Sequence, residues 1–160
     1  MRRPILYDAV FFVALLSAAL AMGGALAHLL ELPNKIGLAR EEYFIVQKAY
    51  RGWNLLAFLL LVELASMVAL AVLSRHAPLV RRFAIGAIAS LLGAQGVFWL
   101  WTFPANMATR NWTFIPPDWA ALRDQWEYSH AAGALFQILA VSLLVVASLH
   151  RARRAEKAAG

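Results

Sequence analysis

Two pairs of proton-transferring side chains stand at helical spacing in distant parts of the chain. His28 and Glu31 form an H-x-x-E pair, and Glu127 and His130 form an E-x-x-H pair. Side chains three residues apart share one face of a helix, so each pair sets an imidazole beside a carboxylate. Metal ligands use this spacing inside helical bundles, and an imidazole can also act as a general base.

The chemistry of these pairs depends on whether they meet in the folded chain. Together they could hold one or two divalent metal ions, with His28, Glu31, Glu127 and His130 as ligands. The two histidines could instead be the axial ligands of a haem. Without a metal, each pair is an ion pair within its own helix near a membrane interface. The sequence leaves these alternatives open.

The second pair ends a segment in which more polar and aromatic side chains share a face. This segment, W-A-A-L-R-D-Q-W-E-Y-S-H, runs from Trp119 to His130 and leads into an apolar stretch. As a helix, it places Trp119, Arg123 and Trp126 on the side of Glu127 and His130. Buried polar groups cost free energy unless they have partners, so such a face on a membrane helix indicates a site.

The composition limits the class of protein. The chain has 160 residues, of which 62% are hydrophobic and 15% are charged, and its mean hydropathy is +0.62. These values are typical of membrane proteins rather than of soluble domains. Cysteine is absent, which excludes thiol chemistry and iron–sulfur clusters.

Four apolar runs are long enough to cross a bilayer as helices, at about 9–31, 53–74, 83–103 and 128–149. The predicted fold is all-α, an integral membrane four-helix bundle. It forms a single domain over residues 1–150, followed by a basic cytoplasmic tail at 151–160 that we expect to be frayed. We expect Pro33 to end the first helix. A short interfacial helix is expected between Ala39 and Arg51.

The basic residues are distributed unequally between the two sides of the bundle. The N-terminus, the second loop and the C-terminus hold nine Lys and Arg residues, and the first and third loops hold six. The positive-inside rule therefore places both termini in the cytoplasm, in a multi-pass protein of the inner (plasma) membrane. This arrangement explains the formal charge of +6. No nucleic-acid partner is expected, because the basic residues do not alternate with aromatic residues on one surface.

The same orientation brings the polar side chains whose burial costs free energy to one end of the bundle. They are His28, Glu31, Tyr50, Asn54, Asn106, Glu127 and His130. Most of the tryptophans at this end should form an interfacial belt, and one or two should line a cavity for a flat apolar molecule. The predicted substrate-binding residues are Tyr50, Asn54, Trp99, Trp119 and Trp126.

Glu63 is an acid near the middle of the second apolar run. An acidic side chain at that depth is costly against lipid, so we expect it to face the bundle interior. There it would be either a proton relay or a hydrogen-bond donor to a group such as Gln95 or Gln137.

Three segments resemble the anthrone-oxygenase-like family of small, mostly uncharacterised four-span membrane proteins. They are A-H-L-L-E-L-P-N-K-I from Ala27, E-Y-F-I-V-Q-K-A-Y-R-G-W from Glu42, and N-M-A-T-R-N-W-T-F-I-P-P-D-W-A-A-L-R-D-Q-W-E-Y-S-H from Asn106. The resemblance covers nearly the whole chain. It implies a four-span fold, and its signature positions are Asn106, Trp119, Arg123, Trp126, Glu127 and His130. A few fungal relatives take part in oxidising anthrones to anthraquinones, which implies oxygenase chemistry.

Two classes of function fit these residues. In the first, the protein is a membrane-embedded oxidoreductase, an oxygenase acting on a planar aromatic or quinone-like molecule that arrives through the lipid bilayer. A histidine would be the base or a metal ligand, and Arg123 and Asn106 would stabilise an enolate-like oxygen. In the second, it is a non-catalytic accessory or binding subunit, in a homo-oligomer or a larger membrane complex, whose polar cluster ties the helices together. The predicted catalytic residues are His28, Glu31, Asn106, Arg123, Glu127 and His130.

Overall fold

The computed structural model describes the backbone of residues 2–159 and the side chains of residues 5–153. Within this part of the chain every regular element is a helix, which confirms the all-α prediction. The elements are α1 (Arg2–Lys35), α2 (Arg40–Val46), η1 (Gln47–Tyr50), η2 (Trp53–Leu55), α3 (Leu56–Leu73), α4 (Pro78–Val97), η3 (Phe98–Thr102), α5 (Phe103–Ala108) and α6 (Trp119–Ala159).

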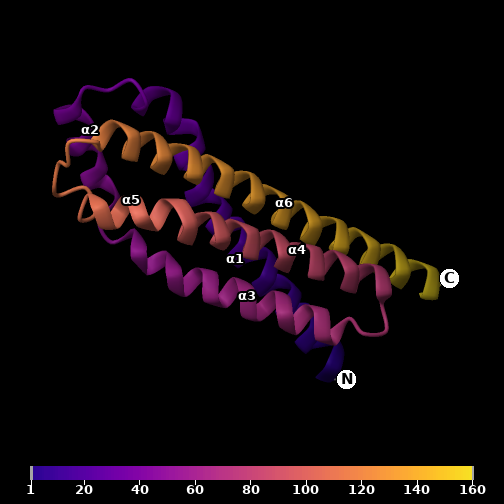
Figure 1. Ribbon diagram of the computed structural model, residues 1–160. Helices are drawn as coiled ribbons and strands as arrows, with labels where there is room; N and C mark the ends of the chain where they lie inside the picture. The colour runs from indigo at the N-terminus through magenta and orange to yellow at the C-terminus, as the bar shows by residue number, and fades with distance from the viewer. Residues whose placement is uncertain (1, 160) are drawn as a thin grey trace.

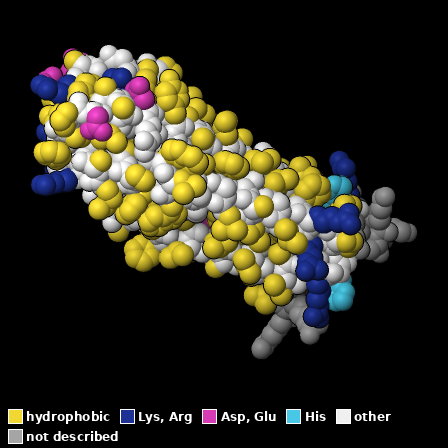
Figure 2. Space-filling view, viewed as in Figure 1, with side chains coloured by type: hydrophobic (Ala, Val, Ile, Leu, Met, Phe, Trp, Pro, Cys, Tyr) yellow, Lys and Arg dark blue, Asp and Glu magenta, His cyan; other side chains and the backbone are white. Residues whose placement is uncertain are grey.

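The chain forms an elongated bundle suited to a bilayer. Four helical segments are long and apolar enough to cross a membrane: Ile5–Lys35, Trp53–Leu73, Pro78–Ala108 and Trp119–Arg153. Both termini lie at one end of the bundle, the terminal end, whereas α2 and α5 lie at the opposite end, the α2 end (Figure 1). Charged side chains gather at the two ends, and hydrophobic side chains cover the surface between them (Figure 2). This distribution is that of a multi-pass membrane protein.

Small side chains let the four long helices approach closely. α6 packs against α1 and α4, and α3 completes the ring by packing against the same two helices. Close packing of small residues is a main source of helix association in lipid. The ring brings α1 and α6, which carry the two His/Glu pairs, into contact. Buried alanines of this core are Ala14, Ala18, Ala71, Ala84, Ala87, Ala140 and Ala147.

Two prolines lie inside membrane-spanning helical segments. The prediction that Pro33 ends the first helix is wrong, because α1 continues to Lys35 and the Ile36 amide still donates to the Leu32 carbonyl at 3.0 Å. Proline has a helix-compatible φ, so the residues after it can remain helical at the cost of one hydrogen bond. Pro104 follows the π-helical segment η3, and such a local widening accommodates the missing amide hydrogen of proline.

Two segments outside the membrane spans are helical, and the sequence predicted a helix for one of them. The interfacial helix predicted between Ala39 and Arg51 is present as α2 and η1. The tail that we expected to be frayed instead continues α6 to Ala159. Its alternation of arginine, alanine, glutamate and lysine favours a helix and contains no breaker.

Glu63 faces the bundle interior, as predicted. Its side chain is fully buried, and Gln137 Nε2 donates to its Oε2 at 3.5 Å. Its Oε1 has no hydrogen-bond partner among the described residues. The contact joins α3 to α6 in the middle of the bundle.

Gly93 marks a close approach of α4 to α6 that can be tested by substitution. A Cβ added there would lie 2.8 Å from Cε1 of Phe136, whereas a Cβ added at Gly96 would meet nothing within 4 Å. Both alanine variants gain helix propensity, but only Gly93→Ala forces the Phe136 ring to move. We expect Gly93→Ala to be less stable than Gly96→Ala by about 1–3 kcal/mol, measured by thermal unfolding in detergent. Equal stabilities would show that the two helices are further apart.

Candidate functional site

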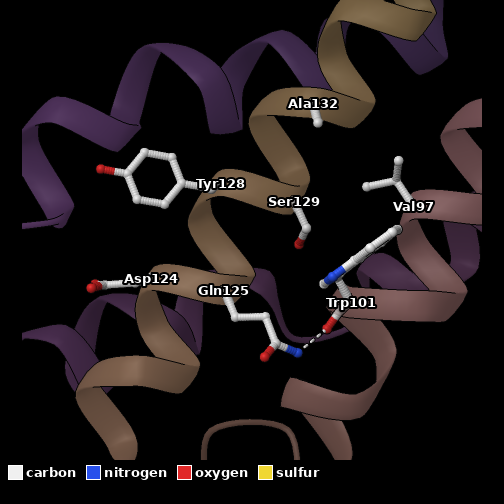
Figure 3. A pocket seen from close by; sticks show the side chains of 7 residues that line it. All are labelled: Val97, Trp101, Asp124, Gln125, Tyr128, Ser129 and Ala132. Atoms are coloured by element: carbon white, nitrogen blue, oxygen red, sulfur yellow. Dashed lines mark hydrogen bonds between the residues drawn. The ribbon is translucent and has the colours of Figure 1, made fainter.

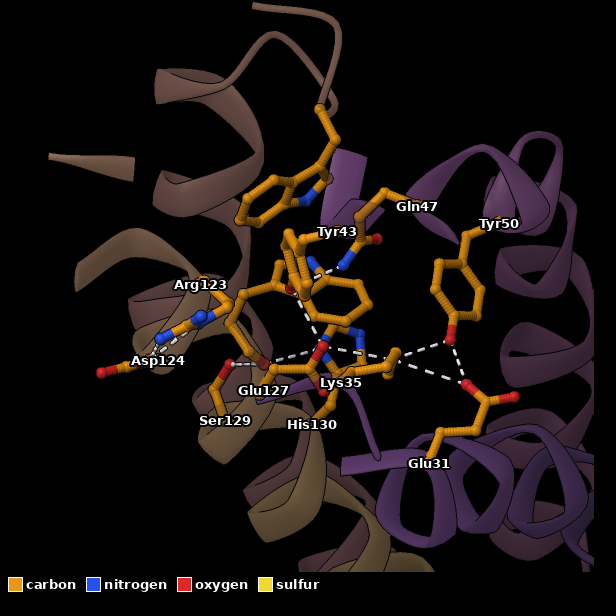
Figure 4. A network of polar contacts seen from close by, with 12 residues as sticks. Glu31, Lys35, Tyr43, Gln47, Tyr50, Arg123, Asp124, Glu127, Ser129 and His130 are labelled. Atoms are coloured by element: carbon orange, nitrogen blue, oxygen red, sulfur yellow. Dashed lines mark hydrogen bonds and ion pairs between the residues drawn. The ribbon is translucent and has the colours of Figure 1, made fainter. Parts of the chain in front are cut away.

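A buried ion pair joins α1 to α6 at the α2 end. Lys35 Nζ lies 3.1 Å from Glu127 Oε1, and the two side chains are 4% and 0% exposed. Charges at such burial are costly unless they are paired and hydrogen-bonded. The pair lies at the centre of a polar network to which α1, α6 and the segment between the first two spans all contribute (Figure 4).

The lysine of this pair is linked to the edge of the network through a tyrosine. Lys35 Nζ donates to the Tyr50 hydroxyl at 2.7 Å, and this hydroxyl donates to Glu31. Glu31 also lies 3.5 Å from Lys35 Nζ, but its side chain is 47% exposed. Glu31 is therefore a peripheral partner of Lys35.

The carboxylate of the pair, Glu127, accepts a hydrogen bond from α2. The Tyr43 hydroxyl donates to Glu127 Oε1 at 2.9 Å, and Gln47 Nε2 donates to the Tyr43 hydroxyl at 2.6 Å. Glu127 Oε2 and Gln47 Oε1 have no hydrogen-bond partner among the described residues. Two oxygen acceptors of the network are therefore unpaired within the described residues.

The two predicted histidines meet beside this network. The ring centroids of His28 and His130 are 4.2 Å apart, and the Trp126 ring lies 3.9 Å from His130 and 5.1 Å from His28. Tyr50 and Trp53 cover His28 at ring distances of 4.6 and 5.1 Å. The buried Nδ1 of His28 has no hydrogen-bond partner in the described part of the chain. The H-x-x-E and E-x-x-H spacings thus do bring the imidazoles together, inside an aromatic enclosure.

Asn106 holds two of the surrounding tryptophans. Its Oδ1 accepts the indole N–H of Trp126 at 2.8 Å and that of Trp112 at 3.2 Å. Trp112 in turn packs against Tyr43, with ring centroids 5.1 Å apart. Asn106 therefore positions the aromatic wall and uses its carbonyl oxygen to do so.

The loop that delivers Trp112 has a strained backbone. Arg110, Asn111 and Trp112 have φ values of 49°, 54° and 60°, and each non-glycine residue in this left-handed region costs about 1–2 kcal/mol. The Trp112 amide is held by the Thr109 hydroxyl at 3.1 Å, and the Trp112 side chain is only 6% exposed. Burial of the indole is thus the main compensation for the strain.

Arg123 and Trp119 lie on the far side of the network from the histidines. The Arg123 guanidinium is 3.0 Å from Asp124, donates to the Leu38 carbonyl at 3.3 Å, and lies 5.2 Å from the Trp119 ring centroid. Trp119 borders Tyr43 at 6.4 Å. Both residues close the network toward α2, and Arg123 does not contact either imidazole.

Two predicted substrate-binding residues lie outside the enclosure. Trp99 is 57% exposed and packs on Phe103, because the π-helical turn of η3 carries it outward. Asn54 is exposed within the short helix η2. These two side chains therefore lie away from the imidazoles, whereas Tyr50 and Trp126 pack against the His28 ring.

The predicted metal site is not formed by the carboxylates and imidazoles. Within the described residues, no group of three or more His, Asp or Glu side chains could hold a metal ion. Glu127 is engaged by Lys35 and Tyr43, and Glu31 by Tyr50. The two imidazoles are in direct ring contact, so a porphyrin does not fit between them. The residues at hand therefore do not suit either a shared metal or a haem.

A separate cavity lies on the opposite face of α6. It has a volume of about 450 Å³ and lies between α6 and the junction of α4 with η3 (Figure 3). Gln125 Nε2 donates to the Trp101 carbonyl at 2.8 Å at its edge. Helical spacing puts Gln125 and Tyr128 on the side away from Glu127 and His130, so this cavity does not open onto the imidazoles.

The two tyrosines of the network are held in their neutral form. Burial raises the pKa of the Tyr43 hydroxyl above its ordinary value, and the neighbouring Glu127 carboxylate adds to the rise. Burial also raises the pKa of the Tyr50 hydroxyl, helped by its hydrogen bond to Glu31. Both hydroxyls therefore stay hydrogen-bond donors across the physiological pH range.

Sequence reasoning missed Lys35, Tyr43, Gln47, Trp53 and Trp112. The expected helix end at Pro33 assigned Lys35 to a loop, although Glu31 and Lys35 stand at an i,i+4 spacing that could have revealed it. Tyr43 of α2 and Gln47 of η1 have the same spacing. No nearby sequence pattern predicts that Trp112 belongs to the site, because its position depends on the left-handed backbone of residues 110–112.

Comparisons of this chain with protein families, with curated proteins and with solved structures find no match. The resemblance to the anthrone-oxygenase-like family therefore stays a prediction from the sequence. The geometry of the α2 end provides the remaining grounds for a function.

The first prediction for this site concerns the ion pair. Removing one charge leaves the other buried and unpaired, so Lys35→Met or Glu127→Gln should each cost about 3–5 kcal/mol of stability. The double variant should lose less than the sum of the two single losses. Arg40→Gln, which breaks the exposed pair with Glu41, is the control and should cost under about 1 kcal/mol. Additive losses in thermal unfolding would contradict a direct Lys35–Glu127 contact.

A second prediction concerns alkaline pH. An ordinary tyrosine ionises near pH 10, so the folded protein should show no ionisation of Tyr43 below about pH 11, and Tyr43→Phe should leave the tyrosinate absorbance unchanged there. In denaturant the same variant should show one ionising tyrosine fewer. Because only the unfolded chain loses this proton, Tyr43 stabilises the fold below pH 10 and its contribution falls at higher pH. A lower tyrosinate signal for the folded variant would show that Tyr43 is solvated.

Proposed function

We propose that the protein is a membrane-embedded oxidoreductase of the anthrone-oxygenase-like kind. It would take a proton from a planar aromatic or quinone-like molecule and let O₂ oxidise the resulting carbanion. The observation that carries this proposal is the contact of the buried His28 with the half-buried His130, with ring centroids 4.2 Å apart, beside a buried lysine. The resemblance of the segment from Asn106 to His130 to the anthrone-oxygenase-like family also supports it.

His130 is the better placed of the two bases. Its Nδ1 lies 2.9 Å from the Trp126 carbonyl, and because a carbonyl oxygen only accepts, Nδ1 carries the hydrogen. In the neutral ring Nε2 then holds the lone pair that can take a proton. His28 offers a second acceptor, its unpartnered Nδ1.

The reaction converts a CH₂ group between aromatic rings into a carbonyl. The imidazole takes one proton, and the electron pair of the broken C–H bond spreads onto the substrate carbonyl oxygen as an enolate. O₂ accepts electrons from this carbon and forms a C–O bond, and the imidazolium returns its proton to the terminal oxygen to give a hydroperoxide. Loss of the second C–H proton breaks the O–O bond and releases water. The balance is one CH₂ group and one O₂ to one C=O group and one H₂O.

Lys35 is the cation suited to stabilise an enolate oxygen near the imidazoles, because the single O–H of Tyr50 is already donated to Glu31. Lys35 Nζ lies 5.0 Å from the Trp126 ring centroid and 4.7 Å from that of Tyr50, and these rings flank His28. A preorganised cation in a water-poor site stabilises developing negative charge. Arg123, for which the sequence predicts this role, is engaged by Asp124 and Trp119 instead.

The proposed setting is the inner (plasma) membrane, with both termini in the cytoplasm and the α2 end outside. The unequal distribution of Lys and Arg supports this orientation. The substrate, being apolar, would reach the α2 end through the bilayer. No separate partner protein is needed for this chemistry.

The alternative is a non-catalytic accessory or binding subunit. Its support is the Lys35–Glu127 pair, which ties α1 to α6 at a separation of 3.1 Å. In that case the polar network exists to fix the bundle, and its variants would change stability only.

The histidines separate the two functions. We expect purified protein in detergent to consume O₂ in the presence of anthrone and to form the anthraquinone absorbance band. His130→Gln should lower kcat by at least about 100-fold, since a lost general base typically costs a factor of 10²–10⁴, while the helices remain folded by circular dichroism.

His150→Gln is the matched control, because His150 stacks on Phe83 at the terminal end and should leave the rate unchanged. An unchanged rate in both His28→Gln and His130→Gln would remove the imidazoles from the mechanism. No O₂ uptake by the wild type, together with lower stability of these variants, would favour the accessory subunit.

A further inference from the structure

A second cavity lies at the terminal end, far from His28 and His130. It has a volume of about 670 Å³ and lies between the start of α1, the turn from α3 to α4, and α6. Sites for small molecules commonly have about 300–1,000 Å³. Its polar lining consists of Tyr7, Ser74, Arg75, His76 and Arg151, and its apolar lining includes Leu6, Val72 and Leu73.

The polar side of this cavity is strongly basic. Five arginines with described side chains lie at the terminal end: Arg75, Arg81, Arg82, Arg151 and Arg153. Among the described side chains, Asp8 is the carboxylate at this end, and it contacts Arg151. Basic side chains and histidines gather visibly at this end of the molecule (Figure 2). The local excess of positive charge attracts anions.

Contacts among the lining residues position the basic groups of the cavity. Arg151 lies over the Tyr7 ring, with Cζ 4.7 Å from the centroid, and the Tyr7 hydroxyl is 2.7 Å from Ser74 Oγ. Arg75 Nε donates to His76 Nε2 at 3.0 Å. Both Arg75 and His76 are exposed, so their remaining N–H groups can reach a ligand.

The apolar side of the cavity continues into the lipid-facing surface. Leu6, Val72 and Leu73 are 56%, 64% and 41% exposed, and they belong to α1 and α3 where these helices approach the bundle end. A free anion would use only the arginines, whereas a phospholipid would use both surfaces. Basic pockets between membrane helices commonly bind anionic lipid head groups.

We propose that this cavity binds an anionic phospholipid of the adjoining leaflet. Arg75 and Arg151 hold its phosphate, and its acyl chains lie along Leu6, Val72 and Leu73. The site is independent of the proposed oxidation at the α2 end.

The test is native mass spectrometry of the full-length protein in detergent, titrated with phosphatidylglycerol or phosphatidylcholine. We expect phosphatidylglycerol to bind at least about tenfold more tightly, because the two arginines attract its net negative head group. The double variant Arg75→Gln and Arg151→Gln should lose this preference. Arg110→Gln, at the α2 end, should keep it.

A second variant guards against a folding defect. Leu73→Trp fills the apolar side of the cavity with both arginines intact, and it should also weaken phosphatidylglycerol binding. Equal binding of the two lipids by the wild type, or an unchanged preference in both variants, would overturn the proposal. Displacement of the lipid by equimolar inorganic phosphate would show a free-anion site instead, and would overturn it as well.

Discussion

The structure of the α2 end depends on the burial of one ion pair. Lys35 and Glu127 are fully enclosed at 3.1 Å, and either charge alone would be costly in that environment. The pair therefore requires α1 to remain helical beyond Pro33 and α6 to begin well before its apolar stretch. A second donor to the same oxygen of Glu127, Oε1, comes from the α2 segment through the Tyr43 hydroxyl. Helix lengths and the interfacial helix thus follow from the same constraint.

Aromatic side chains supply the low-polarity surroundings that make the pair strong. Trp112, Trp119 and Trp126 surround Tyr43 and the imidazoles, and Trp112 reaches its place only through three left-handed residues. A chain that tolerates about 1–2 kcal/mol at each of these residues must regain it, and burial of a tryptophan offers enough apolar area to do so. The loop is therefore a structural part of the site.

The fold was largely predictable because hydrophobicity and length alone identify membrane helices. The proximity of His28 and His130 was also predictable, since helical spacing and the up-and-down order of the spans bring them to one end. The hydrogen-bond and ion-pair partners of Glu31 and Glu127 could not be predicted from the sequence. Lys35 was missed because Pro33 was expected to end the first helix, and Arg123, expected to stabilise the substrate oxygen, pairs with Asp124. Side-chain pairing depends on rotamers and on neighbouring elements, which periodicity does not specify.

The unpaired atoms at the α2 end argue for more than a structural role. Among the described side chains, buried atoms without a partner include His28 Nδ1, Gln47 Oε1 and Glu127 Oε2, and all three border the Lys35 network. A cluster that only fixed the helices would gain stability by satisfying these atoms or by replacing them with apolar groups. The chain keeps them beside two imidazoles and a buried lysine instead. Unsatisfied groups of this kind suit a site whose hydrogen bonds are completed by a substrate, as the proposed oxidation requires.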